Sequence, residues 1–393
     1  MAIQSYYHER TAYTVDAKQI SPHNPRMRSL AVPFFLTLSG LVFVGNLAAG
    51  CGSTSSSGSA PSSGSAPLGD AGVGASDVDG AQPGADGASF DAATSDGAVH
   101  PSDGGTDPNG DGPYPYAEKD ATTLVAATGD NVAIHVAYPT GAGSYPVIVF
   151  GHGFQLMPPQ YYGYLRRLAS FGYVAMTVNY PAAASGPNNP NEAKDMIAGI
   201  DWAAADATFG ANVDTAKAGT TGHSLGGKVA LLAATLDARV KASIVLDPVD
   251  DGGPSGCTAP ACVNVASLLP GLHVPTGFLG ETIDEAGMFG ACAPAASNFT
   301  TFYAKANAPS LEVTVAGANH MSFLDDVSTC GFVCGFCNAA TAPNAQVNQL
   351  ARAFMVAFFE RHLRGNAAFE TYLTGAAAQA RYVATTEASI LSK

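Results

Sequence analysis

The chain has 393 residues and a formal net charge of −14, with 32 acidic against 18 basic residues. No stretch gathers enough lysine and arginine to follow a run of phosphates, so the composition argues against a nucleic-acid partner. Hydrophobic residues make up 47% of the chain, which is ample for a domain with a substantial core.

The N-terminal part has the features of an export signal. Arg26 and Arg28 precede an apolar run over 30–47, and small residues then lead to Cys51. A basic start, an apolar core and a small-residue cleavage site are typical of a secretory signal. The Ala-Ala-Gly-Cys end resembles a bacterial lipobox. We therefore predict a signal over 1–51 and an exported protein that a lipid on Cys51 anchors in the cell envelope.

Two features of this segment affect the interpretation. The apolar run approaches the roughly 20 residues that a membrane-spanning helix needs, so a single transmembrane anchor is the competing hypothesis. Residues 1–25 are more polar than an ordinary signal start, which favours Met27 as the first translated residue.

Residues 52–112 form a second compositional region. They are mainly Gly, Ser, Ala, Pro and Asp, with no Lys, Arg or Glu. Such a segment buries too little apolar surface to offset its ordering entropy, and its like charges repel. We predict a disordered tether that leads to one folded domain over 113–393.

Strand and helix signals alternate over 113–393. Short apolar or alternating segments predict strands, and longer segments with helical periodicity predict helices. The expected strands are 132–138, 146–150, 173–179, 217–221, 242–246, 276–279 and 311–315, and the expected helices are 161–171, 191–205, 228–236 and 346–363. This alternation predicts an α/β fold, with a mainly parallel sheet, helices on both faces and a ligand site at the carboxyl ends of the strands.

A short motif at one of those strand ends predicts the nucleophile. Gly222, Ser224 and Gly226 match G-x-S-x-G, in which a serine occupies a sharp turn between a strand and a helix. The glycines are needed because the tight turn brings backbone segments too close together for a Cβ atom. We therefore predict that Ser224 is a catalytic nucleophile.

A serine nucleophile requires a general base, and three histidines follow the motif. His362 lies inside the last predicted helix, and His273 precedes a strand at its amino end. His320 follows the strand 311–315, so it is the one of the three at a carboxyl edge. We predict that His320 is the base.

Two aspartates are candidates for the acid that orients the base. Asp247 ends the strand 242–246, and Asp284 follows the strand 276–279. Either position is within reach of a histidine loop in this topology, and loop aspartates are commonly caps or turn formers. From the residues alone, one of the two is the acid and the other is structural.

The predicted domain contains six cysteines, at positions 257, 262, 292, 330, 334 and 337. An even number in an exported protein predicts disulfides, in pairings that the sequence leaves open. The alternative is a zinc site built from Cys330, Cys334 and Cys337, because closely spaced thiolates bind zinc. We favour disulfides between Cys257, Cys262, Cys292, Cys330, Cys334 and Cys337, and we expect no metal and no organic cofactor.

Several motifs together resemble the chlorophyllase branch of the α/β-hydrolases, which is close to the cutinase-like polyester hydrolases. The resemblance covers about 145 to 337. It rests on VIVFGHGF at 147–154, GHSLGG at 222–227, DPVD at 247–250, CAP at 292–294 and HMSFLDD at 320–326.

The resemblance implies an α/β-hydrolase fold and assigns the acid to Asp247, with Asp284 in reserve, and the base to His320. Plant chlorophyllases usually have arginine after the nucleophile, where this chain has Leu225. This departure argues against chlorophyll as the substrate and leaves the other assignments unchanged.

Stabilising the negative charge that develops on an ester carbonyl requires backbone N–H donors. The residue after the nucleophile supplies one such donor, which is Leu225. Phe154 is expected to supply the second, with His152 bracing its loop. Phe154, Leu156 and Met157 are expected to line the mouth of the site and to favour an apolar substrate group.

These residues together predict a serine hydrolase that cleaves carboxylic esters through an acyl-enzyme. We expect a monomeric domain, little or no lid, and an ester substrate with an apolar group. The alternatives are a lipase, a phospholipase-type acylhydrolase or a dienelactone-type hydrolase. A different class of function, a surface binding module without catalysis, is the remaining hypothesis.

Overall fold

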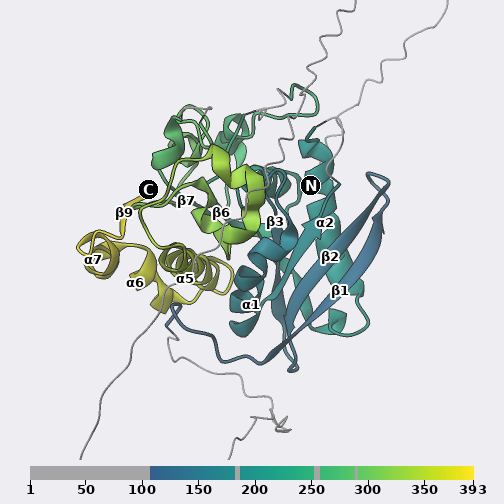
Figure 1. Cartoon of the computed structure of the whole chain (residues 1–393). Coiled ribbons are helices and arrows are strands. Elements are labelled where there is room, and N and C mark those ends of the chain that lie inside the picture. The colour runs from purple at the N-terminus through teal and green to yellow at the C-terminus, as the bar shows by residue number, and fades with distance from the viewer. Residues whose placement is uncertain (1–106, 182–185, 252–256, 288–290) are drawn as a thin grey trace, which may run out of the picture. The chain divides into compact units, whose positions relative to one another are not determined.

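The computed structural model of the chain describes residues 107–181, 186–251, 257–287 and 291–393 (Figure 1). The predicted signal over 1–51, the lipid site at Cys51 and most of the predicted tether lie outside the described residues. Among the described residues, no helix combines the length and apolarity needed to cross a membrane.

Some residues assigned to the tether lie against the folded domain. Arg167 donates a hydrogen bond to the carbonyl oxygen of Pro108 at 2.8 Å, and it forms an ion pair with Asp111. The Gly112 N–H donates to Ser170 Oγ at 2.9 Å. The ordered chain therefore extends to residues before position 113.

A nine-stranded sheet forms the centre of the fold, in the order β1-β2-β4-β3-β5-β6-β7-β8-β9. The strands from β4 to β8 in this order run parallel, whereas β1, β2 and β9 join as antiparallel strands at the two edges. The bounds are β1 Tyr116–Val125, β2 Asp130–Pro139, β3 Tyr145–Gly151, β4 Val174–Asn179, β5 Val213–Gly222, β6 Val240–Leu246, β7 Thr276–Gly280, β8 Ser310–Val315 and β9 Ala388–Ser392.

Helices cover both faces of this sheet (Figure 1). Their bounds are α1 Tyr162–Ser170, α2 Asn189–Ala205, α3 Leu225–Leu236, α4 Phe299–Lys305, α5 Asn344–His362, α6 Glu370–Leu373 and α7 Gly375–Ala378. Side chains of β3 alternate between two cores. Ile148 and Phe150 pack with α1 and α5, whereas Val147 and Val149 pack with α2 and α3. This arrangement confirms the predicted α/β class and the burial of the parallel strands on both faces.

Two glycines of β5 stand where its neighbours leave no room for a side chain. A Cβ on Gly219 would lie 2.7 Å from Cε1 of Phe359, a ring on α5. At the end of the strand, a Cβ on Gly222 would lie 2.5 Å from the backbone carbonyl of Gly226. Gly226 itself lies against β3, where an added Cβ would be 2.1 Å from the carbonyl oxygen of Gly151. The turn between β5 and α3 therefore depends on direct backbone contacts between Gly151, Gly222 and Gly226, which leave no space for side chains.

We predict that Gly226→Ala destabilises the protein by roughly 3 kcal/mol or more, because its Cβ would overlap a backbone oxygen that cannot rotate away. Urea unfolding followed by far-UV circular dichroism measures this loss. Gly271→Ala is the matched control, because an added Cβ there meets nothing within 4 Å. If Gly226→Ala were as stable as this control, the turn would have space for a Cβ atom, and the prediction would be wrong.

Candidate active site

Ser224 occupies the turn between β5 and α3 in a strained conformation. Its φ is +55° and its ψ is −122°, a region that L-residues rarely adopt. Its N–H donates to the carbonyl oxygen of Leu246 at 3.0 Å, which ties the turn to the end of β6. The side chain is half-buried at the carboxyl edge of the sheet, as the sequence motif predicts.

His320 begins a short 3-10 helix, His320–Phe323, just after β8. Its Nε2 lies 2.8 Å from Ser224 Oγ, and its Nδ1 lies 2.6 Å from Asp247 Oδ2. An ionised carboxylate only accepts hydrogen bonds, so Nδ1 carries the ring proton and Nε2 is free to accept the serine proton. His273 precedes β7 and His362 ends α5, so neither follows the carboxyl end of a strand.

The two candidate acids contact different parts of His320. Asp247 is fully buried, has a φ of +41°, and contacts the imidazole. Asp284, 1% exposed, accepts the backbone N–H of His320 at 2.8 Å through Oδ2 and that of Asn338 at 2.6 Å through Oδ1. Asp247 therefore orients the ring, whereas Asp284 fixes the main chain that carries it.

His223, the residue before Ser224, connects three loops of the candidate site. Its Nε2 lies 2.9 Å from the carbonyl oxygen of His320, and its Nδ1 lies 2.9 Å from Tyr161 Oη. Burial lowers the pKa of His223 well below its usual value, so the ring is neutral. Since a carbonyl only accepts, Nε2 carries the proton and Nδ1 accepts from the Tyr161 hydroxyl. Tyr161 in turn accepts the N–H of Gly153 at 3.3 Å.

A buried ion pair holds the chain just beyond Asp247. Lys228 on α3 lies 3.2 Å from Asp250, and both side chains are at most 3% exposed. Asp250 also accepts the backbone N–H groups of Val265 and Ala266. These contacts satisfy the buried carboxylate of Asp250 and fix the segment that follows β6. Sequence reasoning missed this pair, because a lysine inside a helix pattern is typical of an exposed face.

The structure agrees only in part with our expectations for the residues around the substrate. α3 begins at Leu225, so the Leu225 N–H has no acceptor within the helix and is free for a ligand. Phe154 is half-buried, as a residue at the edge of the site would be. The expectation for Leu156 is wrong: it is 3% exposed and packs in the core beside α1. Its N–H donates to the Gly153 carbonyl, which turns the chain back toward the core.

His152 has the structural surroundings that we expected. Its ring stacks on Tyr180 with centroids 4.1 Å apart, and its Nδ1 lies 3.0 Å from the carbonyl oxygen of Gly153. The Tyr180 hydroxyl donates to the His152 carbonyl oxygen. Burial lowers the pKa of His152, so the ring is neutral at pH 7. These contacts brace the loop that leads to Phe154.

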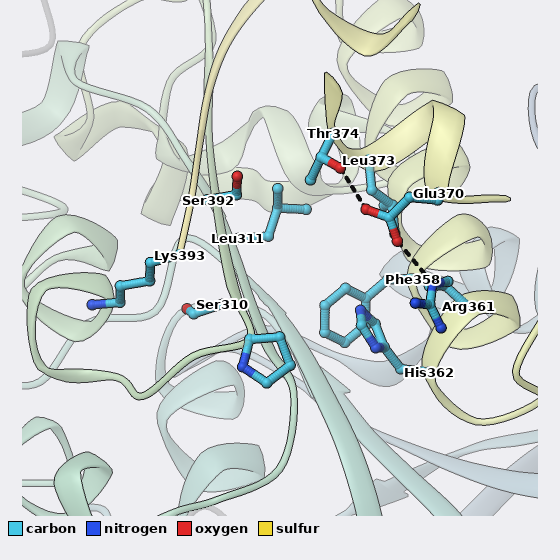
Figure 2. A pocket seen from close by; sticks show the side chains of 11 residues that line it. Ser310, Leu311, Phe358, Arg361, His362, Glu370, Leu373, Thr374, Ser392 and Lys393 are labelled. Carbon is cyan, nitrogen blue, oxygen red and sulfur yellow. Dashed lines mark hydrogen bonds and ion pairs between the residues drawn. The ribbon is translucent and has the colours of Figure 1, made fainter. Parts of the chain in front are cut away.

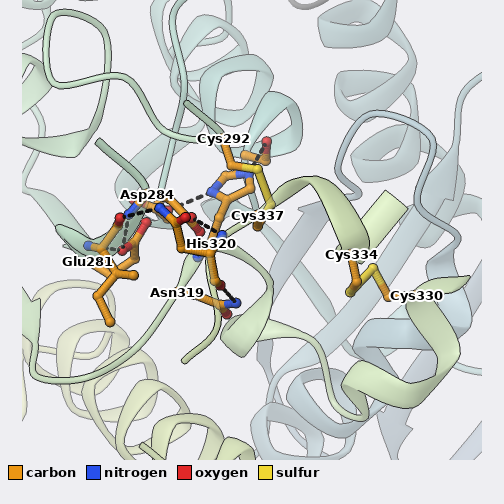
Figure 3. Close-up of a disulfide and its surroundings, with 12 residues drawn as sticks. Glu281, Asp284, Cys292, Asn319, His320, Cys330, Cys334 and Cys337 are labelled. Atoms are coloured by element: carbon orange, nitrogen blue, oxygen red, sulfur yellow. Dashed lines mark hydrogen bonds and ion pairs between the residues drawn. A yellow bond between two sulfur atoms is a disulfide. The ribbon is translucent and has the colours of Figure 1, made fainter. Parts of the chain in front are cut away.

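The six cysteines form three disulfides, which pair Cys257 with Cys262, Cys292 with Cys337, and Cys330 with Cys334. Figure 3 shows the Cys292–Cys337 bond beside His320 and Asp284. Because the sulfurs are bonded to one another, Cys330, Cys334 and Cys337 do not form the alternative zinc site. The same bonds remove the thiolates from a group of donors at Asp284, Cys292 and Cys337.

Two cavities among the described residues lie away from Ser224. One, of about 600 Å³, lies at the amino end of β8 and is lined by Ser310, Phe358 and Arg361, among others (Figure 2). The other, of about 420 Å³, is formed by strands β1, β2 and β4 and by the residues Met157 to Pro159. Met157 is 57% exposed and lines this second cavity.

The parallel sheet, the strained serine turn and the order of the strand-end residues define an α/β-hydrolase. A family described as Chlorophyllase matches residues 110–380. The chain belongs to the chlorophyllase family.

Individual relatives agree with this family. Chlorophyllase-1 of Arabidopsis thaliana is 28% identical over 251 residues, which cover 60% of this chain and 77% of the relative. The bis(hydroxyethyl) terephthalate hydrolase of Streptomyces coelicolor is 24% identical over 192 residues, covering 49% and 55%. Lipase 1 of a Moraxella species is 30% identical over 153 residues, covering 37% and 46%.

We predict that the Cys292–Cys337 disulfide contributes more to stability than the Cys257–Cys262 disulfide, because it closes a longer loop. The Cys292–Cys337 bond spans 45 residues and the Cys257–Cys262 bond spans 5. Chain entropy assigns about 4 kcal/mol to the longer loop and about 2 kcal/mol to the shorter one. Urea unfolding of Cys292→Ala/Cys337→Ala and Cys257→Ala/Cys262→Ala measures the two losses. Equal losses would contradict a stabilisation set by loop length.

Proposed function

We propose that the protein is a serine hydrolase that cleaves carboxylic esters. The observation that carries this proposal is the continuous hydrogen-bonded series from Asp247 through His320 to Ser224, with contacts of 2.6 and 2.8 Å. Membership of the chlorophyllase family and likeness to a terephthalate ester hydrolase and a lipase support ester hydrolysis. No step of the reaction below requires a metal or an organic cofactor.

The contacts support a two-step acyl transfer as the mechanism. His320 Nε2 accepts the proton of Ser224 as Oγ attacks the ester carbonyl carbon, and Asp247 stabilises the resulting imidazolium. The N–H groups of Leu225 and Phe154 stabilise the oxyanion. The carbon–oxygen bond to the alcohol then breaks, and the alcohol leaves with the proton from Nε2. Water, activated by the same nitrogen, releases the acid and restores Ser224.

The substrate that the site supports best is an ester with an apolar group. Leu225 packs against the core formed with α2 and α3, and Phe154 is half-buried at the end of the loop after β3. An apolar residue directly after the nucleophile offers no charged contact to a substrate. The likeness to Lipase 1 favours a lipase as the second candidate.

A cellular location is a second part of the proposal. We propose that the protein is exported and attached to the cell envelope through a lipid on Cys51. Three disulfides support this, because such bonds persist in oxidising compartments. The membrane partner in this proposal is the lipid bilayer that holds the anchor.

We expect Ser224→Ala to lower kcat/KM for p-nitrophenyl butyrate by at least about 10³-fold, because the acyl-enzyme no longer forms. Release of p-nitrophenol by the purified full chain measures the rate. Ser267→Ala replaces an exposed serine and serves as the control. Equal rates for Ser224→Ala and the unaltered protein would reject the serine hydrolase and favour the binding module.

The roles of the two aspartates are separable in the same assay. Asp247→Asn is expected to lower kcat by on the order of 10³–10⁴-fold, because an amide favours the wrong imidazole tautomer. Asp284→Asn keeps one oxygen acceptor for the two backbone N–H groups, so we expect a loss below about 10²-fold. A larger loss at Asp284 than at Asp247 would reverse the two assignments.

A further inference from the structure

Three buried carboxyl groups meet behind the imidazole of His320. Asp247 directly follows β6, Glu281 and Asp284 follow β7, and all three are at most 1% exposed. One oxygen of Asp247, one oxygen of Glu281 and one nitrogen of His320 all lie within 4.8 Å of one another. Figure 3 shows Glu281 and Asp284 on the same side of His320. The mechanism above uses Asp247 and Asp284 but gives Glu281 no role.

The hydrogen bonds of these carboxyl groups leave two oxygens without partners. Glu281 Oε2 accepts the backbone N–H groups of Ile283 and Asp284, and Asp247 Oδ2 contacts His320. Glu281 Oε1 and Asp247 Oδ1 are buried and have no hydrogen-bond partner among the described residues. Since the carboxyl groups of Asp247 and Glu281 lie this close together in a buried site, they repel when both are ionised, and a proton on one of them removes the repulsion.

The charges around Glu281 determine which carboxyl holds that proton. The ionisable groups that face it are Asp247 from β6, Asp284 from the segment after β7 and His320 from the segment after β8. None of the ion pairs formed by the described residues includes Glu281. Burial, and then the charge of Asp247, raise the pKa of Glu281 to about 9. Burial also raises the pKa of Asp247, but the His320 hydrogen bond and the Glu281 backbone N–H oppose this rise.

We propose that Glu281 is a neutral positioning residue, whose carboxyl donates a hydrogen bond from Oε1 to Asp247 Oδ1 and thereby keeps Oδ2 on the imidazole of His320. This proposal rests on the proposed function, since it assigns Asp247 to the triad. Glu281 does not touch the substrate. Its protonated carboxyl supplies a hydrogen-bond donor for Oδ1 of Asp247. Because Glu281 is neutral, the site holds no second negative charge beside Asp247 and the single imidazole of His320.

The protonated state has a consequence for the pH profile. When Glu281 loses its proton, its carboxyl group can no longer donate a hydrogen bond and becomes a second carboxylate beside Asp247. The repulsion between the two carboxylates displaces Asp247 from Nδ1 of His320. We expect kcat/KM of the unaltered protein to fall about tenfold as the pH rises through about 9. Glu281→Gln removes the titration but keeps an N–H donor for Asp247 and an oxygen acceptor for Ile283 and Asp284.

The first test compares pH profiles of kcat/KM for p-nitrophenyl butyrate between pH 6 and 10. Glu281→Gln is expected to keep activity within about threefold at pH 7 and to lose the decline near pH 9, whereas Glu281→Leu, which has no donor, loses at least about tenfold at pH 7. Glu312→Gln, a buried glutamate on β8, is the matched control and retains the decline. An unchanged decline in Glu281→Gln, or failure of this near-isosteric variant to fold, overturns the proposal.

The second test does not depend on activity and therefore separates this proposal from the proposed function. Because the folded state holds the Glu281 proton to a higher pH than the unfolded state, stability falls as the pH rises from about 4.5 to about 9. We expect the urea midpoint of the unaltered protein to fall more between pH 6 and pH 9 than that of Glu281→Gln. Equal falls would show that Glu281 is ionised in the folded protein, even if the protein had no esterase activity.

Discussion

The contact between the end of β3 and the first turn of α3 determines where the rest of the site lies. Gly151, Gly222 and Gly226 touch through backbone atoms alone, so β3, β5 and α3 meet more closely than any side chain would permit. Between Gly222 and Gly226, Ser224 has a positive φ, and its hydroxyl lies 2.8 Å from Nε2 of His320. It also brings the start of α3 against the backbone of Gly151 and His152 at the end of β3.

Around the Ser224 turn, the protein buries several polar and charged side chains. The pairing of each group limits the cost: His223 has partners on both nitrogens, Lys228 faces Asp250, and Asp284 accepts two backbone N–H groups. These contacts mostly link segments that follow different strands. Ser224, His320 and Asp247 are therefore held by neighbours from several parts of the chain, and loss of one segment would affect the geometry of the others.

The sequence was sufficient to predict the parallel core, and it located most residues of the candidate site, because both depend on short patterns with strict steric or chemical requirements. It did not predict β1, whose Glu118, Lys119 and Asp120 are typical of a loop and are accommodated only because the strand lies at an edge. The choice between Asp247 and Asp284 as the predicted acid required the resemblance to chlorophyllases, because both residues follow parallel strands. They differ in which part of His320 they contact, which the sequence does not reveal. Glu281 gave no signal, because a carboxylate after a strand usually faces solvent.

The Cys292–Cys337 bond has a consequence for when the site is complete. His320 lies between these cysteines in the sequence, so the disulfide closes a covalent ring that contains α4, β8 and the imidazole. Asn338, directly after the second cysteine, shares Asp284 with the His320 backbone. In a newly made chain with free thiols, only non-covalent contacts would hold this ring closed. Oxidation of one pair of sulfurs therefore links the maturation of the hydrolase to the compartment in which that oxidation takes place.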